Sequence, residues 1–323
     1  MDAPHLPTAN SVPPDSMWAA AVRSALRVIP SLGIKPERFF NRTPLSGANA
    51  SVRDPGGRMK IEVVSHCWNY SHLLVYQLSS LVLSPPQTVE IVMTVCYCSE
   101  DKGTAELLAF FEQQNVPGVT WNWIEVPREV LLRRSVGRNL AAKASEADWV
   151  WFTDCDVVFA DGCFDGLAEA VADCRDLLVY PREERCTMML DADDPVLVAS
   201  REGPGVRSVN FDDFLVQRPR QATGPLQITR GDAARTWGYC GEISSYQRTT
   251  DRWRKTYEDR VFRWLLGTRG TPVEFPGVYR IKHVEKGRYQ SGWWGRLRSF
   301  IRRRDDASRG DAVEESHFRK NNS

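Results

Sequence analysis

The stretch GRNLAAKASEADWVWFTDCDVVF, which runs from Gly137 to Phe159, decides the fold class that we expect for this chain. It begins with an alanine-rich segment of helical composition and continues into the apolar run Trp149–Thr153, which indicates a buried strand. Two aspartates on either side of a cysteine, Asp154 and Asp156, follow at once. Because side chains alternate along an extended backbone, both carboxylates are expected on the same side.

This pair of carboxylates predicts a site for a divalent cation. Hard carboxylate oxygens suit Mg²⁺ or Mn²⁺, which favour few protein ligands together with substrate phosphates. We therefore expect Asp154 and Asp156 to hold Mn²⁺ or Mg²⁺ against a diphosphate, where the cation offsets the charge of a departing group. The alternative is an ordinary solvated loop after a buried strand, where aspartate is a common turn residue.

The chain before this stretch alternates between strand and helix patterns. Strands are predicted at Lys60–Ser65, Glu90–Cys96 and Val119–Val126, and helices at Ser71–Leu83, Thr104–Asn115 and Val136–Glu146. This rhythm predicts an α/β fold with a mostly parallel sheet flanked by helices. Ligands of such sheets bind beyond the carboxyl ends of the strands. A helix at Trp253–Leu266 and a short strand at Val278–His283 are expected later in the chain.

Composition restricts the class of protein. The net charge of +1, from 42 basic and 41 acidic residues, argues against a nucleic-acid partner. The 8 cysteines include no C-x-x-C pair, so neither a zinc site nor a disulfide framework is expected. There is no secretory signal pattern and no apolar run of about 20 residues, so a cytoplasmic location is expected.

Three regions are predicted. Residues 1–58 are expected to form a leader, a short helix at Met17–Leu32 and a linker. Residues 59–285 are expected to form the catalytic domain, and residues 286–323 a basic, aromatic tail that ends in disorder.

The quoted stretch resembles the core of the family 2 glycosyltransferases, whose pattern there is Arg-Asn, a small-residue helix, an apolar strand and D-x-D. Three more pieces follow in family order, namely Val63–Tyr70, Gly224–Gly241 and the pair Glu258-Asp259. The resemblance implies a GT-A type fold and transfer of a single sugar, with inversion, from a nucleotide-sugar donor to an acceptor hydroxyl. It also implies dependence on Mn²⁺ or Mg²⁺.

The resemblance also implies roles for individual residues. Asp154, Cys155 and Asp156 would lie at the metal and the ribose-diphosphate, Arg138 and Asn139 would support the nucleotide, and Ser65 would lie near the base. The family usually has V-D-D-G-S-T-D after its second strand, whereas this chain has Val95-Cys96-Tyr97-Cys98-Ser99-Glu100-Asp101. A specificity for uridine is therefore not implied, and Tyr97 is expected to stack on a base or to lie in a shifted loop.

Inverting transfer requires a base for the incoming hydroxyl. By resemblance Asp259 is this base and Glu258 supports it or contacts the acceptor; the alternative is ordinary charge at a helix start. His283 is expected as a third metal ligand by analogy with some GT-A enzymes, and otherwise as a structural histidine.

The acceptor is expected to be a glycan, a lipid-linked molecule or a small molecule with a hydroxyl. Residues 287–304 combine Trp293, Trp294 and Phe300 with Arg296, Arg298 and Arg302–Arg304, which suits peripheral contact with the inner face of an anionic membrane. The alternative is a tail packed on its own domain. Two other functions stay open: a nucleotidyltransferase, through the Gly-rich stretch Gly267–Pro272, and a non-catalytic carbohydrate-binding protein of the same fold.

Overall fold

The structure is a computed structural model that describes residues 12–41, 45, 57–253 and 256–284. The predicted basic, aromatic segment 287–304 lies outside the described residues, as does most of the predicted linker between 42 and 56. No helix of the described residues has the length and apolar character that crossing a bilayer requires.

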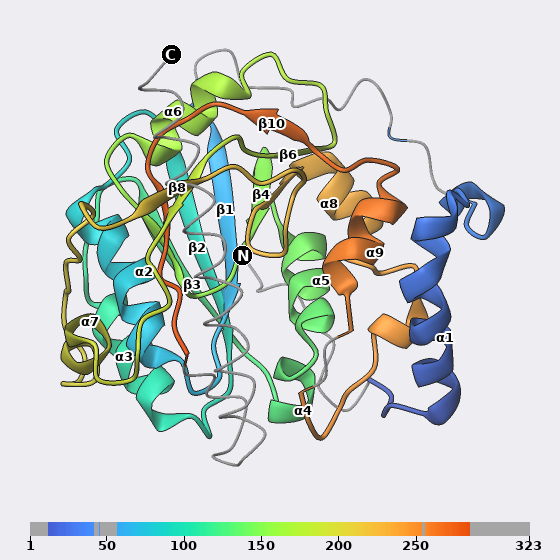
Figure 1. The fold of residues 1–323 in the computed structure, drawn as a ribbon, viewed down its shortest axis with the longest axis horizontal. Coiled ribbons are helices and arrows are strands. Elements are labelled where there is room, and N and C mark those ends of the chain that lie inside the picture. Colours follow the sequence, from blue (N-terminus) through green and yellow to red (C-terminus); the bar gives the residue numbers. More distant parts are fainter. Residues whose placement is uncertain (1–11, 42–44, 46–56, 254–255, 285–323) are drawn as a thin grey trace, which may run out of the picture.

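A seven-stranded sheet forms the centre of the fold, in the order β10-β6-β9-β4-β1-β2-β3 (Figure 1). Its parallel half comprises β1 (Lys60–His66), β2 (Glu90–Tyr97), β3 (Val119–Glu125) and β4 (Trp149–Phe152). These are runs of apolar and β-branched residues, and β1 and β4 are buried along most of their length, as expected for strands covered on both faces. The predicted α/β class is confirmed.

The other half of the sheet contains one antiparallel strand. Strand β9 (Gln227–Arg230) lies between β4 and β6 (Leu178–Pro181) and is antiparallel to both, and β10 (Thr271–Val273) is parallel to β6. Strands β10 and β6 therefore run in the same direction as β4.

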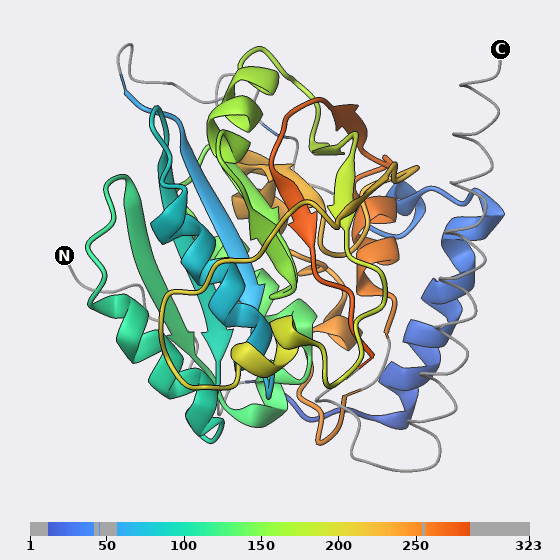
Figure 2. The ribbon, with the colours of Figure 1, turned by 60° about the vertical axis from the view of Figure 1, so that its left-hand side comes forward.

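Helices cover both faces of the sheet. Figures 1 and 2 show α2 (Ser71–Leu83) and α3 (Lys102–Glu112) on one flank, and α5 (Arg134–Ala144), α8 (Gly231–Trp237) and α9 (Glu258–Leu265) on the other. The predicted helix at Trp253–Leu266 begins only at Glu258, because Tyr257 adopts a left-handed backbone with φ of 57°. The short helices are α4 (Arg128–Leu131), α6 (Cys163–Ala170) and α7 (Pro195–Ala199).

A second, four-stranded sheet has the order β5-β11-β7-β8. It comprises β5 (Val157–Phe159), β11 (Val278–Arg280), β7 (Glu184–Cys186) and β8 (Leu215–Gln217). The chain passes from β4 of the large sheet to β5 of the small sheet through Asp154, Cys155 and Asp156. The two sheets thus fix the acidic turn at both of its ends.

The N-terminal helix α1 (Met17–Val28) packs beside α9 and continues into two 3₁₀ turns, Ile29–Leu32 and Pro36–Arg38. Ser16 caps the helix by accepting a hydrogen bond from the Ala19 N–H at 3.1 Å. The buried Arg23 donates to the Ser245 carbonyl at 2.6 Å and to Asp15 at 2.7 Å. These contacts bind α1 to the rest of the fold.

Candidate active site

The turn that carries Asp154 and Asp156 lies at the carboxyl end of β4, where ligands of parallel sheets bind. Gln77, buried in α2, donates to the backbone carbonyls of Asp154 at 3.0 Å and Val157 at 2.9 Å. From the opposite flank, Arg138 of α5 donates to the Thr153 carbonyl at 2.9 Å. The backbone of the turn is therefore held from both sides of the sheet.

Two arginines of α5 hold the Asp154 side chain. Its Oδ1 accepts hydrogen bonds from Arg134 Nη1 at 2.8 Å and from Arg138 Nη2 at 3.2 Å. The Arg138 side chain is 1% exposed and that of Arg134 15% exposed, so both charges are shielded from water. Charge-assisted hydrogen bonds are stronger than neutral ones, and these two fix the direction of the first carboxylate of the pair.

Among the described residues, no three His, Cys, Asp or Glu side chains are grouped so as to hold a metal ion. The predicted ligands Asp154, Asp156 and His283 therefore do not form a preassembled three-ligand centre. Two carboxylates still fit Mg²⁺ or Mn²⁺ when substrate phosphates supply further oxygens. Metal binding stays a prediction.

Arg134 also reaches the predicted catalytic helix. Its Nη2 lies 2.6 Å from Glu258 Oε1, and its Nε donates to the same oxygen at 2.8 Å. Glu258 is 4% exposed, and its Oε2 accepts a hydrogen bond from the Thr256 hydroxyl. One guanidinium thus joins the acidic turn after β4 to the first residue of α9.

These contacts decide the charge of Glu258. Burial alone would raise the pKa of its carboxyl group, but the positive charge of Arg134 and the Thr256 hydroxyl outweigh burial and lower the pKa to about 2. Glu258 is therefore ionised and paired at neutral pH. Such a carboxylate supports its neighbours well and accepts a proton poorly.

Asp259 has different surroundings, although it is the next residue. Its side chain is 31% exposed, and its nearest cation, Arg263 Nη1, is 3.5 Å away. Gly224 lies alongside, because a Cβ at that position would come within 3.8 Å of Asp259 Cβ. Of the two acids that open α9, Asp259 is the one that an incoming molecule can reach.

A buried polar chain connects Asp259 to the turn after β4. Arg138 Nη1 donates to the Tyr239 hydroxyl at 3.0 Å, which donates to Gln227 Oε1 at 2.8 Å. Gln227 Nε2 donates in turn to the Asp259 carbonyl at 3.0 Å. Burial raises the pKa of Tyr239 well above its ordinary value, so its hydroxyl keeps its proton.

Asn139 supports Tyr239, a member of this polar chain, through its side-chain oxygen. Its Oδ1 accepts a hydrogen bond from the Tyr239 N–H at 3.0 Å, inside a turn where Gly238 has a φ of 67°. A Cβ at Gly238 would lie 2.0 Å from that oxygen. Arg138 and Asn139, predicted to support a nucleotide, are thus placed to support the acidic turn and helix α9, and direct contact with a nucleotide stays a prediction.

A small, partly open pocket adjoins the acidic turn. Its wall combines the loop after β1, the turn between α4 and α5, and the turn after β4, with the residues His66, Trp68, Tyr70, Leu131, Leu132, Arg134, Cys155 and Trp253. Three aromatic side chains beside an arginine suit a planar ring next to an anionic group. A hydrogen bond with Cys67, and then burial, raise the pKa of the Cys155 thiol, so its contribution to the wall is uncharged.

Ser65 and Tyr97, the residues predicted to contact the nucleotide base, are not on the wall of this pocket. Ser65 immediately precedes the wall residue His66; it is 1% exposed, and its hydroxyl has no hydrogen-bond partner among the described residues. Tyr97, at the end of β2, pairs in register with Glu125 of β3. Burial, followed by the charge of Glu125, raises the pKa of Tyr97. Stacking of Tyr97 on a base stays a prediction.

His283 follows β11, two residues after Ile281, whose N–H donates to the Asp156 carbonyl at 2.9 Å. Its ring is buried and contacts the rings of Tyr70 and His72, with centroids 5.7 Å and 6.0 Å away. The end of β11 therefore lies beside the acidic turn, and His283 contacts Tyr70 of the pocket wall.

A second ion pair lies near Asp156. Arg280 Nη2 is 2.7 Å from Glu184 Oε1. Burial raises the pKa of Glu184, Arg280 opposes this, and the charge of Asp156 adds to it. The charge of Asp156 therefore acts on this ion pair between β11 and β7.

Sequence reasoning did not identify Arg134, His66, Trp68 or the pocket role of Trp253. The resemblance of Val63–Tyr70 to a nucleotide-facing loop was the available signal for His66 and Trp68. No signal marked Arg134, since its importance depends on Glu258, 124 positions further along the chain.

No protein-family model and no curated protein matches this chain. Among solved structures, it is similar to residues 1–349 of TarS from S. aureus, with 15% identity and a TM-score of 0.40, over 69% of this chain and 60% of TarS 1–349. The complex of TarS 1–349 with UDP-GlcNAc gives 13% identity and a TM-score of 0.43, over 72% and 62% of the two chains. This chain therefore spans less than two thirds of these TarS structures.

Proposed function

We propose that this protein is a glycosyltransferase of the GT-A type, which moves a single sugar from a nucleotide-sugar donor to an acceptor hydroxyl with inversion. One observation carries the proposal: Arg134 joins Asp154, at the carboxyl end of β4, to Glu258 at the start of α9, beside an aromatic pocket. A donor-side acidic pair and a base-side acidic pair are thereby joined at the edge of the sheet where ligands bind.

In this proposal the pocket takes the nucleoside, and Asp154 and Asp156 would hold Mn²⁺ or Mg²⁺ beside the donor diphosphate. When bound, the cation offsets the charge that develops on the diphosphate. Asp259 takes the proton of the acceptor hydroxyl while the hydroxyl oxygen attacks the anomeric carbon. The bond from that carbon to the diphosphate breaks, and the nucleoside diphosphate leaves with the bonding electrons.

The division of roles within the Glu258-Asp259 pair supports this scheme. A base must be reachable and able to accept a proton, and Asp259 is the more exposed of the two acids. Glu258, with a pKa of about 2 and a guanidinium against it, fixes the position of α9. We therefore assign proton transfer to Asp259 and positioning to Glu258.

The nucleotidyltransferase alternative loses its one sequence argument. The Gly-rich stretch Gly267–Pro272 leads into β10, which runs in the same direction as β4. The stretch therefore lies at the amino ends of the parallel strands, the edge of the sheet opposite to Asp154. Gly270 packs there against Tyr180 and Ala222, with a φ of 90°.

Thermal-shift measurements with a panel of nucleotide sugars, each with and without Mn²⁺, test the proposal. The panel includes UDP-GlcNAc, which is bound in one of the TarS structures. At least one nucleotide sugar is expected to raise the Tm in a Mn²⁺-dependent way, and free sugars are expected to have no effect. Stabilisation by free sugars alone would instead favour the non-catalytic carbohydrate-binding protein.

A further inference from the structure

Exposed apolar side chains are concentrated in one short part of the described chain. Of its ten exposed large hydrophobic residues, five lie between Met17 and Phe39, and these five include the two most exposed, Met17 at 92% and Trp18 at 71%. The other three are Val28, Leu32 and Phe39. Exposed apolar side chains that are grouped together, unlike single ones, are typical of an interaction surface.

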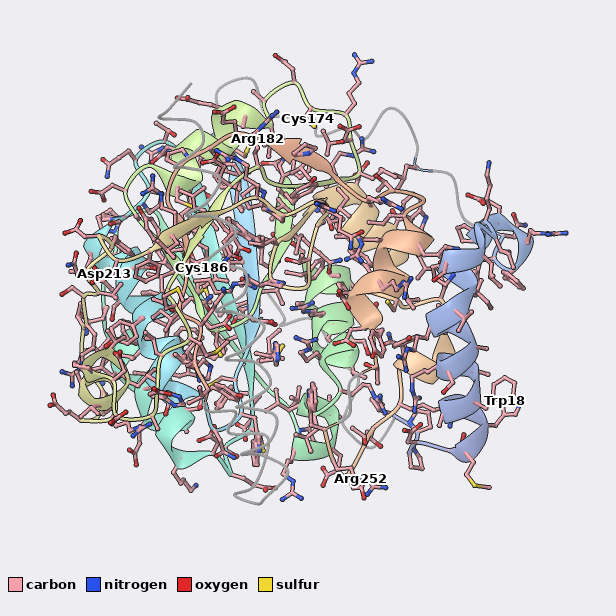
Figure 3. The ribbon with its side chains drawn as sticks, viewed as in Figure 1. Trp18, Cys174, Arg182, Cys186, Asp213 and Arg252 are labelled. Carbon is pink, nitrogen blue, oxygen red and sulfur yellow. The ribbon has the colours of Figure 1, made fainter. Side chains whose placement is uncertain are left out.

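The geometry of α1 places Met17 and Val28 on one side of the helix. Met17, Ala21, Ala25 and Val28 are all exposed and recur at intervals of three or four residues, which is the spacing of one helix face. The opposite face, with Ala19, Arg23 and Leu26, is buried against the domain. Figure 3 shows Trp18 pointing away from the fold at the outer flank. We call residues 17–39 the α1 surface.

The charge of the α1 surface indicates its partner. Arg27, Lys35 and Arg38 are exposed there, and Glu37 is its one acidic residue. An apolar stripe flanked by basic side chains suits the interface of a bilayer with anionic lipids. A symmetric contact between two copies would instead bring like charges face to face. The observations therefore favour a lipid surface over a second copy.

The α1 surface is also connected to the acceptor side of the candidate active site. One face of α9 contacts it repeatedly: Arg27 stacks on the Tyr257 ring at 4.4 Å, and Trp264 Nε1 donates to the Ile34 carbonyl at 2.6 Å. Arg260, between them, donates to the Ser31 hydroxyl. The same helix begins with Glu258 and Asp259.

From these observations we infer that the α1 surface docks the enzyme on an anionic bilayer, and that the acceptor is a lipid-carried hydroxyl. The docking part stands on exposure and charge alone, whereas the acceptor part rests on the proposed function. The α1 surface contacts α9, and α9 carries the proposed base, Asp259. Docking through the α1 surface would therefore bring α9 close to the membrane. The α1 surface is a different part of the sequence from residues 287–304, for which membrane contact was predicted.

Co-sedimentation of the full chain with vesicles tests the docking. The parent protein is expected to bind vesicles of phosphatidylcholine with phosphatidylglycerol more strongly than phosphatidylcholine alone. Replacing Trp18→Glu and Leu32→Glu together should lower the partition coefficient at least about tenfold, because two apolar contacts become charged. The matched control Val198→Glu with Leu215→Glu adds the same charge at exposed apolar sites elsewhere and should bind as the parent does.

Two outcomes would overturn the docking inference. One is equal partitioning of the parent and the Trp18/Leu32 variant, with both shown to be folded by circular dichroism. Residues 287–304 are present in both proteins, so equal binding would be due to that segment and not to the α1 surface. The other is a parent that is dimeric by light scattering, with a monomeric Trp18/Leu32 variant, which would identify a second copy as the occupant.

The acceptor class has its own readout, which uses a labelled donor from the nucleotide-sugar panel. Label is expected to enter the organic-soluble fraction when the enzyme receives vesicles of a total cell lipid extract, and less so for the Trp18/Leu32 variant. Label that enters only water-soluble products would overturn the lipid-carried acceptor. A failed donor panel would overturn the proposed function and leave the vesicle result to stand by itself.

Discussion

At the scale of single residues, neighbouring acids in this chain have different surroundings and so different chemistry. Asp154 is held by Arg134 and Arg138, while Asp156 acts on the Arg280–Glu184 pair. Glu258 is buried and paired, while Asp259 is partly exposed. The first acid of each pair, Asp154 or Glu258, is thus paired with Arg134, which fixes the two pairs relative to each other.

The first prediction concerns Asp156. Asp156→Ala is expected to abolish the Mn²⁺-dependent part of nucleoside diphosphate binding and to leave the fold intact, because the Arg134 and Arg138 contacts use Asp154. Titration calorimetry with and without Mn²⁺ measures this. Asp154→Asn should impair both binding and stability, since it disturbs its contacts with Arg134 and the buried Arg138. Binding by Asp156→Ala at parental strength, or in excess chelator, would contradict the metal assignment.

The second prediction follows from the pKa of Glu258. Its folded-state pKa of about 2 lies below the ordinary value of 4.5, so the ionised carboxylate stabilises the fold above pH 4.5. This contribution, about 3 kcal/mol, is lost as the pH falls from 4.5 towards 2. Urea unfolding across this window should show a steeper loss of stability for the parent than for Glu258→Gln. If the stability of the two proteins fell in parallel as the pH is lowered, the lowered pKa assigned to Glu258 would be contradicted.

At the scale of elements, the position of α9 depends on a few turns and polar contacts. The turn at Gly238 supports Asn139 and Tyr239, and Tyr239 continues the polar chain to α9 through Gln227. Arg134 adds a second connection between α5 and α9. Helix α9 has only eight residues, so these contacts, rather than its own length, determine where Asp259 lies.

The third prediction tests the turn at Gly238. Gly238→Ala combines a backbone that favours glycine, with φ of 67° and ψ of −171°, with a Cβ that would lie 2.0 Å from Asn139 Oδ1, so it should destabilise the fold by more than about 2 kcal/mol. Gly267→Ala is the matched control, since Gly267 has the same φ of 67° but open space around it. It should cost only the backbone strain, about 1 kcal/mol. Equal losses in urea unfolding would show that the contact with Asn139 is unimportant.

At the scale of the whole molecule, the sequence predicted what is local and not what is distant. Strands β1 to β4 and helix α2 were found because each is a run with one clear period, and α2 matches its predicted bounds. The short strand predicted at Val278–His283 is present as β11 (Val278–Arg280), whereas the short strands β9 and β10 were missed because partners from distant parts of the chain stabilise them. Both acidic pairs were recognised from their residue types and their order along the chain. The contact of Arg134 with Asp154 and Glu258 could be seen only in the structure.

The central claim, that Asp259 acts as the base on a donor bound at the turn after β4, is tested most directly by Asp259→Asn. Single-turnover kinetics and donor affinity are measured for this variant and for Asp213→Asn, an exposed residue on the opposite flank (Figure 3). We expect Asp259→Asn to slow sugar transfer about 10²-fold or more with little change in donor Kd, and Asp213→Asn to match the parent. Unimpaired transfer by Asp259→Asn, or lost donor binding with normal turnover of what binds, would contradict the account.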